Sequence, residues 1–586
     1  MSEKNTGTLP VWNLADLYAS DTDPAIAVLW PDIDAAIAAL RGAFAANTAP
    51  LETLISRYEH ILTRLGRVSS YAGLRHAAAT GDEAVSRFYA QISELVSERH
   101  KNLAFFTHGL IELPDPALDA GKYNTWLTLL RRHKAHQLPL DVEEILIEKS
   151  LTSRDAFVRL FDETLAGLRF DFEETEATEA DVLHILSTST DRARRANAAA
   201  TFGAGLEKLS HSFTLITNTL AKDWGMESAW RKFDHPADSR HLDNQVSRQS
   251  VDALTASVVA AYPALSHRYY QLKAKGLGLE KLAPWDRNAP WPGVNVPQYS
   301  WAEAQDIVLQ AFGRFHPLFK ETAALFFANG WIDAAPRPGK DSGAFSHPVT
   351  PDTHPYILMN YYGSARDVMT LAHELGHGVH QYLAREQGYL LADTPLTLAE
   401  TASIFGEMLT FDYLRSTVTD TAGKKALLTG KIEDALNTVV RQIAFHQFET
   451  AVHERRANGE LSFSDLGALW LEIQRAALGD AFSLDESYKT FWMYIPHFIH
   501  TPFYVYAYAY ADGVVNSLYA RYTAAPNGFA DKLVDVLRRG GSVPTARALA
   551  PFGLNPDEPT FWDDGLKMIS ALIDELEAAL KDDEKD

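Results

Sequence analysis

The chain contains 586 residues, of which 46% are hydrophobic and 22% charged, and it has no cysteine. This composition is that of a packed globular protein, and at this length we expect more than one lobe because single cores stop growing near ~250 to 300 residues. Asp and Glu outnumber Lys and Arg by 76 to 54, a net charge of −22, which disfavours nucleic acid and anionic membranes as partners. The lack of cysteine excludes disulfides, thiol nucleophiles and Cys-bound zinc, so that His, Asp and Glu are the remaining metal ligands.

No window of about 18 residues is uninterruptedly apolar, and the polar N-terminal segment lacks a basic stretch followed by an apolar one. The sequence therefore predicts a soluble, cytoplasmic protein with no membrane partner. Nothing in it predicts an oligomeric state.

Apolar residues recur at spacings of three and four over residues 35–44, 51–65, 182–202 and 251–272, which predicts amphipathic helices and a mainly α fold. Capping boxes beginning at Thr178 and Ser300 agree with helix starts there. The helical pattern pauses near residues 202–205. We therefore predict an N-terminal helical domain over residues 1–200 and a second domain over residues 201–586.

A Pro-rich stretch at residues 334–355 predicts a loop, with a Gly-containing turn at residues 339–343. Residues 356–360 follow as a short apolar run rich in β-forming residues. This run predicts a strand, so that a small sheet should lie beside the helices.

The next predicted helix carries the motif HExxH. Ser364 with Asp367 forms an N-terminal capping signal, and the helical run continues through His373, Glu374 and His377. Residues four apart share a helix face, so both imidazoles can bind one metal ion, at ~2.0–2.1 Å for zinc. Glu374 then lies beside the metal, where it can accept a proton from zinc-bound water and return it to a leaving amine. The motif therefore predicts amide hydrolysis with one catalytic zinc per chain.

A catalytic zinc site needs a third protein ligand. Gln387 to Tyr389 can end the first helix, and Thr394-Pro395 can begin a second helix that carries Glu400 and Glu407, seven residues apart. We predict that Glu400 is this ligand; the alternative is that it caps a helix together with Thr397.

Metal-bound histidines usually donate their other ring N–H to an acceptor. Glu407 is a candidate for that acceptor, although a solvated surface acid is also compatible with the sequence. A third zinc-binding histidine six residues after His377 is excluded because Leu383 occupies that position. His380 is interpreted as a packed histidine or as a partner of a ligand.

Near the C-terminal end, residues 495–510 contain His497, His500 and tyrosines at every second position from Tyr504. Tyrosine O–H and histidine N–H groups can stabilise the oxyanion formed during amide hydrolysis. The alternatives are a strand face or the buried stripe of a helix.

The sequence around these residues resembles the M3 metallopeptidases of the oligoendopeptidase F type. The resemblance rests on HELGH at residues 373–377 with flanks at 355–364 and 398–403, on residues 495–498 and 503–508, and on residues 12–18. It therefore covers nearly the whole chain.

The resemblance implies a two-lobed helical fold that encloses a deep channel, with short unstructured peptides as substrates. It also implies a set of residue roles: metal ligands His373, His377 and Glu400, general base Glu374, and transition-state donors His497, Tyr504 and Tyr508, with His497 favoured over His500. The strand at residues 356–360 would bind an extended peptide, and the turn at residues 339–343 would form a mobile flap.

Two other functions stay open. One is a zinc carboxypeptidase on a related helical fold, which needs a cation for the substrate C-terminus. The other is a zinc-stabilised peptide-binding module without turnover, against which Glu374 argues because a structural zinc site needs no base.

Overall fold

The computed structural model describes residues 6–114, 119–294 and 297–583. The chain divides into two compact units, each built from separated segments. The first unit comprises Met1–Lys134, Val296–Thr419 and Leu518–Asn555, and the second comprises Ala135–Asn295, Asp420–Ser517 and Pro556–Asp586. Residue 200 lies within a helix of the second unit, and the domain division predicted there stays a prediction.

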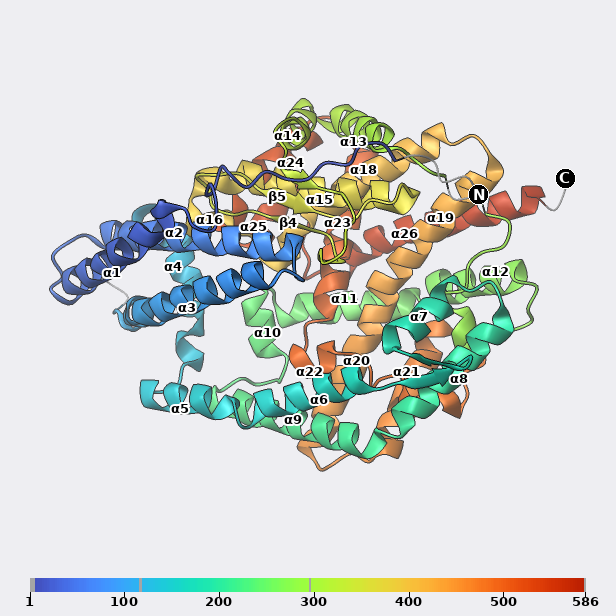
Figure 1. Ribbon diagram of the computed structural model, residues 1–586. Coiled ribbons are helices and arrows are strands. Elements are labelled where there is room, and N and C mark those ends of the chain that lie inside the picture. The colour runs from blue at the N-terminus through green and yellow to red at the C-terminus, as the bar shows by residue number, and fades with distance from the viewer. Residues whose placement is uncertain (1–5, 115–118, 295–296, 584–586) are drawn as a thin grey trace. The chain divides into compact units, whose positions relative to one another are not determined.

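The first unit is mainly helical, and its helices α1, α2 and α3 pack side by side (Figure 1). Its helices are α1 (Pro24–Ala45), α2 (Leu51–Ala78), α3 (Glu83–Glu112), α4 (Asn124–Arg131), α13 (Trp301–Phe315), α14 (Pro317–Ala328), α15 (Ala365–Ala384), α16 (Tyr389–Ala392), α17 (Leu396–Ala399), α18 (Thr401–Thr417), α24 (Phe529–Arg538) and α25 (Thr545–Leu549).

The second unit is also helical, with an apolar core rich in aromatic rings from α8, α9, α20 and α21. It contains α5 (Leu140–Ser150), α6 (Arg154–Gly167), α7 (Glu179–Thr188), α8 (Arg192–Glu207), α9 (Ser210–Trp230), α10 (Asp238–Asp243), α11 (Arg248–Ala261), α12 (Arg268–Gly276), α19 (Thr421–Leu436), α20 (Gln442–Ala457), α21 (Phe463–Leu478), α22 (His497–His500), most of α23 (Tyr506–Ala524), α26 (Pro559–Asp583) and the hairpin β1 (Phe170–Phe172) with β2 (Thr175–Ala177).

The mainly α fold with a small sheet is confirmed, but two predicted helical stretches are interrupted. Residues 182–202 form most of α7 and most of α8, because Asp191 caps α8 by accepting hydrogen bonds from the backbone N–H groups of Ala193 and Arg194. Residues 251–272 form α11 and α12, joined by a π-helical turn at Pro263–His267. The capping boxes at Thr178, Ser300 and Ser364 are all present.

The first unit contains a three-stranded sheet in the order β3-β5-β4, and β4 and β5 contact α15. Strand β5 (Tyr356–Leu358) pairs in parallel with β3 (Ile332–Asp333) and antiparallel with β4 (Phe345–His347). The expectation that residues 356–360 would bind a peptide as an added strand is therefore wrong, because both edges of β5 are already paired. The two edge strands of this sheet are β3 and β4.

The Gly-containing turn that precedes β4 is fixed to the sheet by a buried lysine. The Lys340 ammonium donates to the backbone carbonyls of Asp333 and Met359, at 3.0 and 2.6 Å, and to the Asp333 carboxylate at 2.7 Å. Because a buried charge with three partners is costly to expose, this anchor argues against a mobile flap at residues 339–343.

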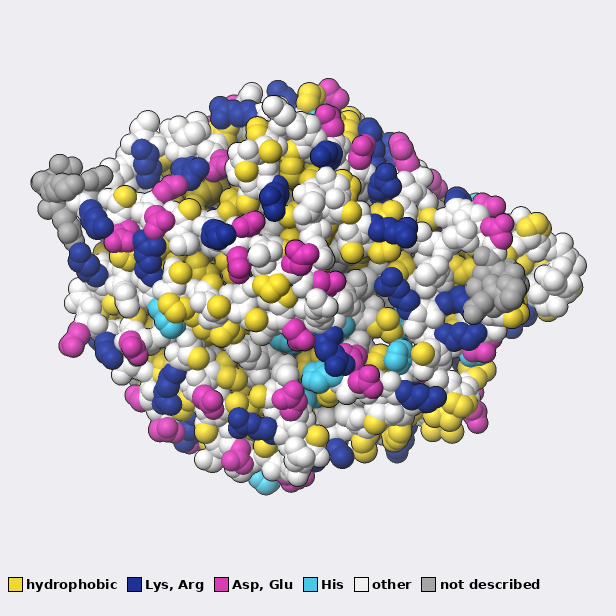
Figure 2. Space-filling view, turned by 180° about the vertical axis from the view of Figure 1, so that it is seen from behind, with side chains coloured by type: hydrophobic (Ala, Val, Ile, Leu, Met, Phe, Trp, Pro, Cys, Tyr) yellow, Lys and Arg dark blue, Asp and Glu magenta, His cyan; other side chains and the backbone are white. Residues whose placement is uncertain are grey.

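On the face shown in Figure 2, acidic and basic side chains are interspersed rather than gathered into a patch of one sign. Among the described residues, no helix is both long and apolar enough to cross a membrane. The channel expected between the lobes stays a prediction.

Candidate metal centre and active site

The HExxH sequence lies in the middle of α15, where the expected cap starts the helix. The Ser364 hydroxyl accepts from the backbone N–H of Asp367 at 3.1 Å, and the Asp367 carboxylate accepts from the backbone N–H of Ser364 at 2.9 Å. The apolar face of α15 is buried, while His373 and His377 are only partly buried. The helix therefore holds its two imidazoles on the side that is open to small molecules.

The helix α18 packs closely against α15. A Cβ atom at Gly376 would collide with the backbone of α18 at Ala402 and Ser403, so that glycine is needed for this approach. The chain between the two helices turns at Gly388, whose φ of +82° favours glycine. Glu400 follows at the junction of α17 and α18. The close packing of α15 and α18 brings Glu400 to the two histidines.

The three predicted metal ligands converge. One oxygen of Glu400 lies 3.4 Å from Nε2 of His373 and 3.3 Å from Nε2 of His377. Among the described residues, this is the one group of three His or acidic side chains whose ligand atoms lie within 4.8 Å of one another. Two ligand atoms that are each about 2.0–2.1 Å from a tetrahedral ion lie about 3.3 Å apart, and the N,N,O donor set is typical of catalytic zinc. The residues therefore fit a bound metal ion.

The alternative role of Glu400 as a capping partner of Thr397 is not supported. Thr397 lies inside α17, after its N-cap residue Pro395. The Ser403 hydroxyl donates to Glu400 at 2.7 Å and orients the carboxylate. Burial by itself raises the pKa of Glu400. Hydrogen bonding and the charges of the two histidines have the larger, opposite effect, so that the pKa of Glu400 falls to about 2.

Glu407, about two turns after Glu400 on α18, faces the other side of His373. Its carboxylate lies 3.4 Å from Nδ1 of His373. Burial lowers the pKa of His373, but this contact and the neighbouring carboxylates together raise it to about 9. The geometry supports the role predicted for Glu407 as acceptor of the second ring N–H and does not fit a solvated surface acid.

Glu374 is 6% exposed and points toward the small sheet. Burial raises the pKa of its carboxyl group, which also accepts a hydrogen bond from the backbone N–H of Ser346 in β4. Gln381, two turns further along α15, donates to the Ser346 carbonyl at 3.0 Å and accepts from its hydroxyl at 2.8 Å. The contacts of Ser346 fix the edge strand to α15 and orient Glu374.

The contacts of Ser346 were not predicted from the sequence, whereas His380 is packed, in agreement with one of its two interpretations. His380 is buried, burial lowers its pKa to about 4, and it makes a hydrogen bond with the backbone of Ala399, next to Glu400. No local motif marks Ser346, because its position depends on strand pairing with β5. The sequence feature that pointed to a role for His380 is its position about one helical turn after His377.

The predicted oxyanion donors lie in the second unit, near the start of α23. Nε2 of His497 lies 3.1 Å from the hydroxyl of Tyr508, and the rings of Tyr504 and Tyr508 are 5.4 Å apart. His500 instead lies 2.7 Å from the Asp162 carboxylate. Of the candidates, His497, Tyr504 and Tyr508 form one cluster and His500 does not.

The remaining tyrosines of this segment belong to the core. Tyr506 and Tyr510 are nearly fully buried, and their hydroxyls bond to Asn244 and Ser250. Tyr508 is 37% exposed. Tyr504 and Tyr508, four residues apart, therefore lie on the accessible face of this segment. Tyr506 and Tyr510, also four residues apart, lie on its buried face.

Comparisons with known proteins agree with this site. The family model for peptidase family M3 matches residues 185–568, and a model for oligopeptidase F matches residues 117–170. The oligopeptidase PepF of Bacillus subtilis is 25% identical, with 97% of this chain and 87% of the relative covered. The chromosomal oligoendopeptidase F of Lactococcus lactis subsp. cremoris is 24% identical, with 90% of each chain covered.

Solved structures share the fold. A putative peptidase from Chlamydophila abortus has a TM-score of 0.82 at 21% identity, covering 97% of this chain and 100% of that one. Oligoendopeptidase-F from Enterococcus faecium has a TM-score of 0.67 at 20% identity, covering 94% and 98%. With a family model that matches most of its length and a His–His–Glu group that fits a metal ion, this chain belongs to peptidase family M3 and is a metallopeptidase.

Proposed function

We propose that the chain is a zinc endopeptidase that hydrolyses internal bonds of short, unstructured oligopeptides. His373, His377 and Glu400 would hold one zinc ion. The observation that carries this proposal is the convergence of two imidazole nitrogens and one carboxylate oxygen in the first unit. The names of the relatives, which are oligopeptidases and oligoendopeptidases, support the class of substrate.

When bound, zinc supplies a Lewis acid that polarises the scissile carbonyl and makes the attacking water more acidic. Glu374 accepts the proton of that water and later donates it to the leaving amine. The N–H of Ser346 holds the carboxylate in place for both transfers. Glu407 keeps the ring of His373 oriented through its Nδ1.

In this proposal His497, Tyr504 and Tyr508 donate hydrogen bonds to the oxyanion that forms as water attacks the carbonyl. Their mutual contacts and the exposure of Tyr508 support this role. Because the charge develops only in the transition state, such donors act on kcat more than on KM.

The test combines metal analysis with mapping of cleavage sites. Purified protein should contain one zinc per chain, lose activity with a chelator and regain it with added zinc. Mass spectrometry of a mixed peptide pool should show fragments cut several residues from either end. Release of single C-terminal residues alone would favour a carboxypeptidase, and full activity without metal would reject the proposal. The cytoplasmic location stays a prediction.

A further inference from the structure

A cavity of about 640 Å³ lies within the first unit and begins at the metal ligand His377. One side is α15, which contributes His377 and Gln381, and Arg385 lies directly after its last residue. The others are formed by α2, by the segment that follows β4, and by the segment that follows Gly388. A cavity of this size next to a catalytic metal site can hold several residues of a peptide.

The cavity follows the axis of α15. His377, Gln381 and Arg385 are spaced by four residues, and all three border it. Arg385 follows the last residue of α15, so that eight residues, or about 12 Å of helix rise, separate it from His377. An extended peptide rises about 3.3 Å per residue. The cavity therefore has room for about three or four substrate residues between the metal site and Arg385.

Arg385 has no carboxylate partner among the described residues. Its guanidinium lies over the ring of Tyr382, whose centroid is 3.5 Å from the guanidinium carbon. Elsewhere in this unit, Arg337 and Arg75 each make two hydrogen bonds to one aspartate. Stacking on a ring orients a guanidinium and leaves its in-plane N–H groups free to bind an anion.

The other titratable groups around the cavity do not replace this charge. Among the residues that the structure describes, Arg385 is the one Arg or Lys that borders it. Burial lowers the pKa of His347 to about 4, which keeps that ring neutral, and His354 lies 3.1 Å from the Asp16 carboxylate. Asp393 also borders the cavity, and partial burial of its carboxyl group raises its pKa, so it adds no positive charge. The positive charge that a ligand meets in this cavity is that of Arg385.

We propose that Arg385 binds a carboxylate of the substrate, about three or four residues from the bond that is cleaved. This inference rests on the proposed function, because it takes His377 to mark the catalytic metal. The carboxylate belongs to the C-terminus of the peptide or to an acidic side chain at that distance. Since the N-terminus of a peptide is cationic, Arg385 repels it, and the cavity receives the C-terminal part of the substrate.

The test uses three matched peptides. The first is a free C-terminal acid that ends three or four residues after the cut, the second is its C-terminal amide, and the third is an amide of the same peptide with glutamate as its last residue. A charge-assisted hydrogen bond changes affinity by about 10- to 100-fold. Wild-type protein should therefore cleave the free acid with a kcat/KM about 10- to 100-fold higher than that of the amide. The glutamate amide shows whether a side-chain carboxylate is accepted as well.

Arg385→Gln should cleave acid and amide with equal kcat/KM and keep its metal, and Arg385→Lys should retain part of the preference. Arg366→Gln, an exposed arginine at the start of α15, is the matched control and should behave as wild type. Equal rates of wild type on all three peptides, or an undiminished preference in Arg385→Gln, would overturn the inference while leaving the proposed function intact. Failure of wild type to cleave any peptide would instead reject the proposed function.

Discussion

Each unit carries a set of histidine and glutamate side chains centred on one helix, and the two sets differ in what surrounds them. In the first unit, His373 and His377 on α15 are partly exposed and lie within 3.4 Å of Glu400. In the second unit, His446, Glu449 and His453 on α20 are all buried. Their ligand atoms do not converge as those of the first set do.

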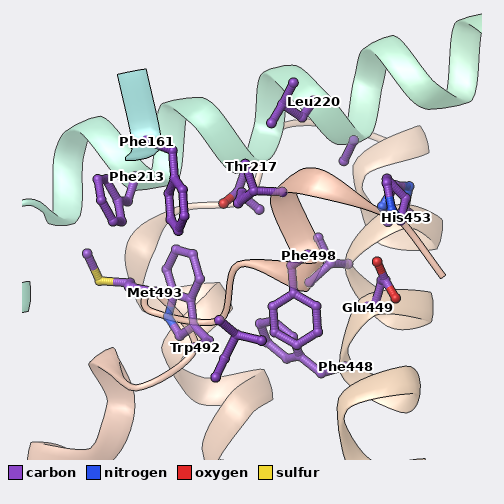
Figure 3. Close-up of a pocket in the computed structure, with 15 residues that line it drawn as sticks. Phe161, Phe213, Thr217, Leu220, Phe448, Glu449, His453, Trp492, Met493 and Phe498 are labelled. Carbon is purple, nitrogen blue, oxygen red and sulfur yellow. The ribbon is translucent and has the colours of Figure 1, made fainter. Parts of the chain in front are cut away.

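The surroundings of the second set are apolar. Glu449 and His453 border a cavity of about 30 Å³, and Figure 3 shows them on one side of it with the rings of Phe161 and Phe213 on the opposite side. No hydrogen-bond partner in the described part of the chain meets Nδ1 of His446 or His453. The space suffices for about one water molecule.

These surroundings shift the histidine pKa values in opposite directions. Carboxylates hold the pKa of His373 at about 9, while burial lowers the pKa values of His446 and His453 to about 3. Histidine and glutamate at helical spacing are therefore insufficient for a metal site. A metal site also needs an acidic side chain from a second segment close to the two histidines, and α18 places Glu400 there.

The largest effect should come from removing a ligand of the first set. His377→Ala should lose the bound metal and with it more activity than the ~10²–10⁴-fold that a lost general base costs. Metal analysis and peptide hydrolysis measure both. His446→Gln should keep its metal content, because the ligand atoms of the second set do not converge. If His446→Gln lost the metal while His377→Ala kept it, the metal site would belong to the second set and not to the first.

Glu374→Gln separates metal binding from catalysis within the first set. The variant keeps the shape of the side chain and should retain the metal, but kcat should fall ~10²–10⁴-fold because the amide cannot accept a proton. Steady-state kinetics and metal content check this. Glu386→Gln, an exposed acid just after α15, serves as the control; a kcat near that of wild type in Glu374→Gln would remove Glu374 from the mechanism.

The exposed cluster of the second unit should affect turnover without affecting metal. Tyr508→Phe should lower kcat by ~10²–10³-fold with a smaller change in KM, since one oxyanion donor is lost. Tyr504→Phe should have a smaller effect, and His497→Ala a larger one than His500→Ala.

Tyr506→Phe is the matched control for these donors. The buried hydroxyl of Tyr506 bonds to His241 and Asn244, so this variant should lower the melting temperature and leave kcat unchanged. Unchanged kinetics in all the variants of the exposed cluster would place the oxyanion donors elsewhere.

The smallest effect on activity is expected at the buried acid of the second set, which should act on stability instead. Burial raises the pKa of Glu449 from its ordinary value of 4.5 to about 8, although the backbone of Phe503 and the charge of Arg240 lower it in part. Between these pH values the unfolded chain loses the proton and the folded chain keeps it, so stability falls as pH rises, by up to about 1.4 kcal/mol per pH unit.

Glu449→Gln should remove this part of the pH dependence without changing metal content. Urea unfolding between pH 5 and pH 8 measures the slope, with Glu472→Gln, an exposed acid on α21, as control. Equal slopes in wild type and Glu449→Gln would show that Glu449 is ionised in the folded protein.

Much of the local structure follows from the sequence. The cap at Ser364, the amphipathic pattern of α15 and the spacing of its histidines are properties of neighbouring residues, and they predict the helix and its accessible face. The interruptions at Asp191 and Pro263 were missed, because apolar periodicity continues across a short break. The spacing of four between Tyr504 and Tyr508 predicted their common side, but the burial of Tyr506 and Tyr510 came from tertiary packing.

By itself, the sequence determined the reacting groups of this protein: two imidazoles and a carboxylate on one helix, with no cysteine to replace them. The tertiary structure decided which distant groups meet them. The approach of α18 to α15 at Gly376 places Glu400 and Glu407, and the pairing of β4 with β5 places Ser346 beside Glu374. The physical reason is that helix caps and periodicity depend on residues a few positions apart, whereas convergence depends on packing between segments that no local pattern encodes.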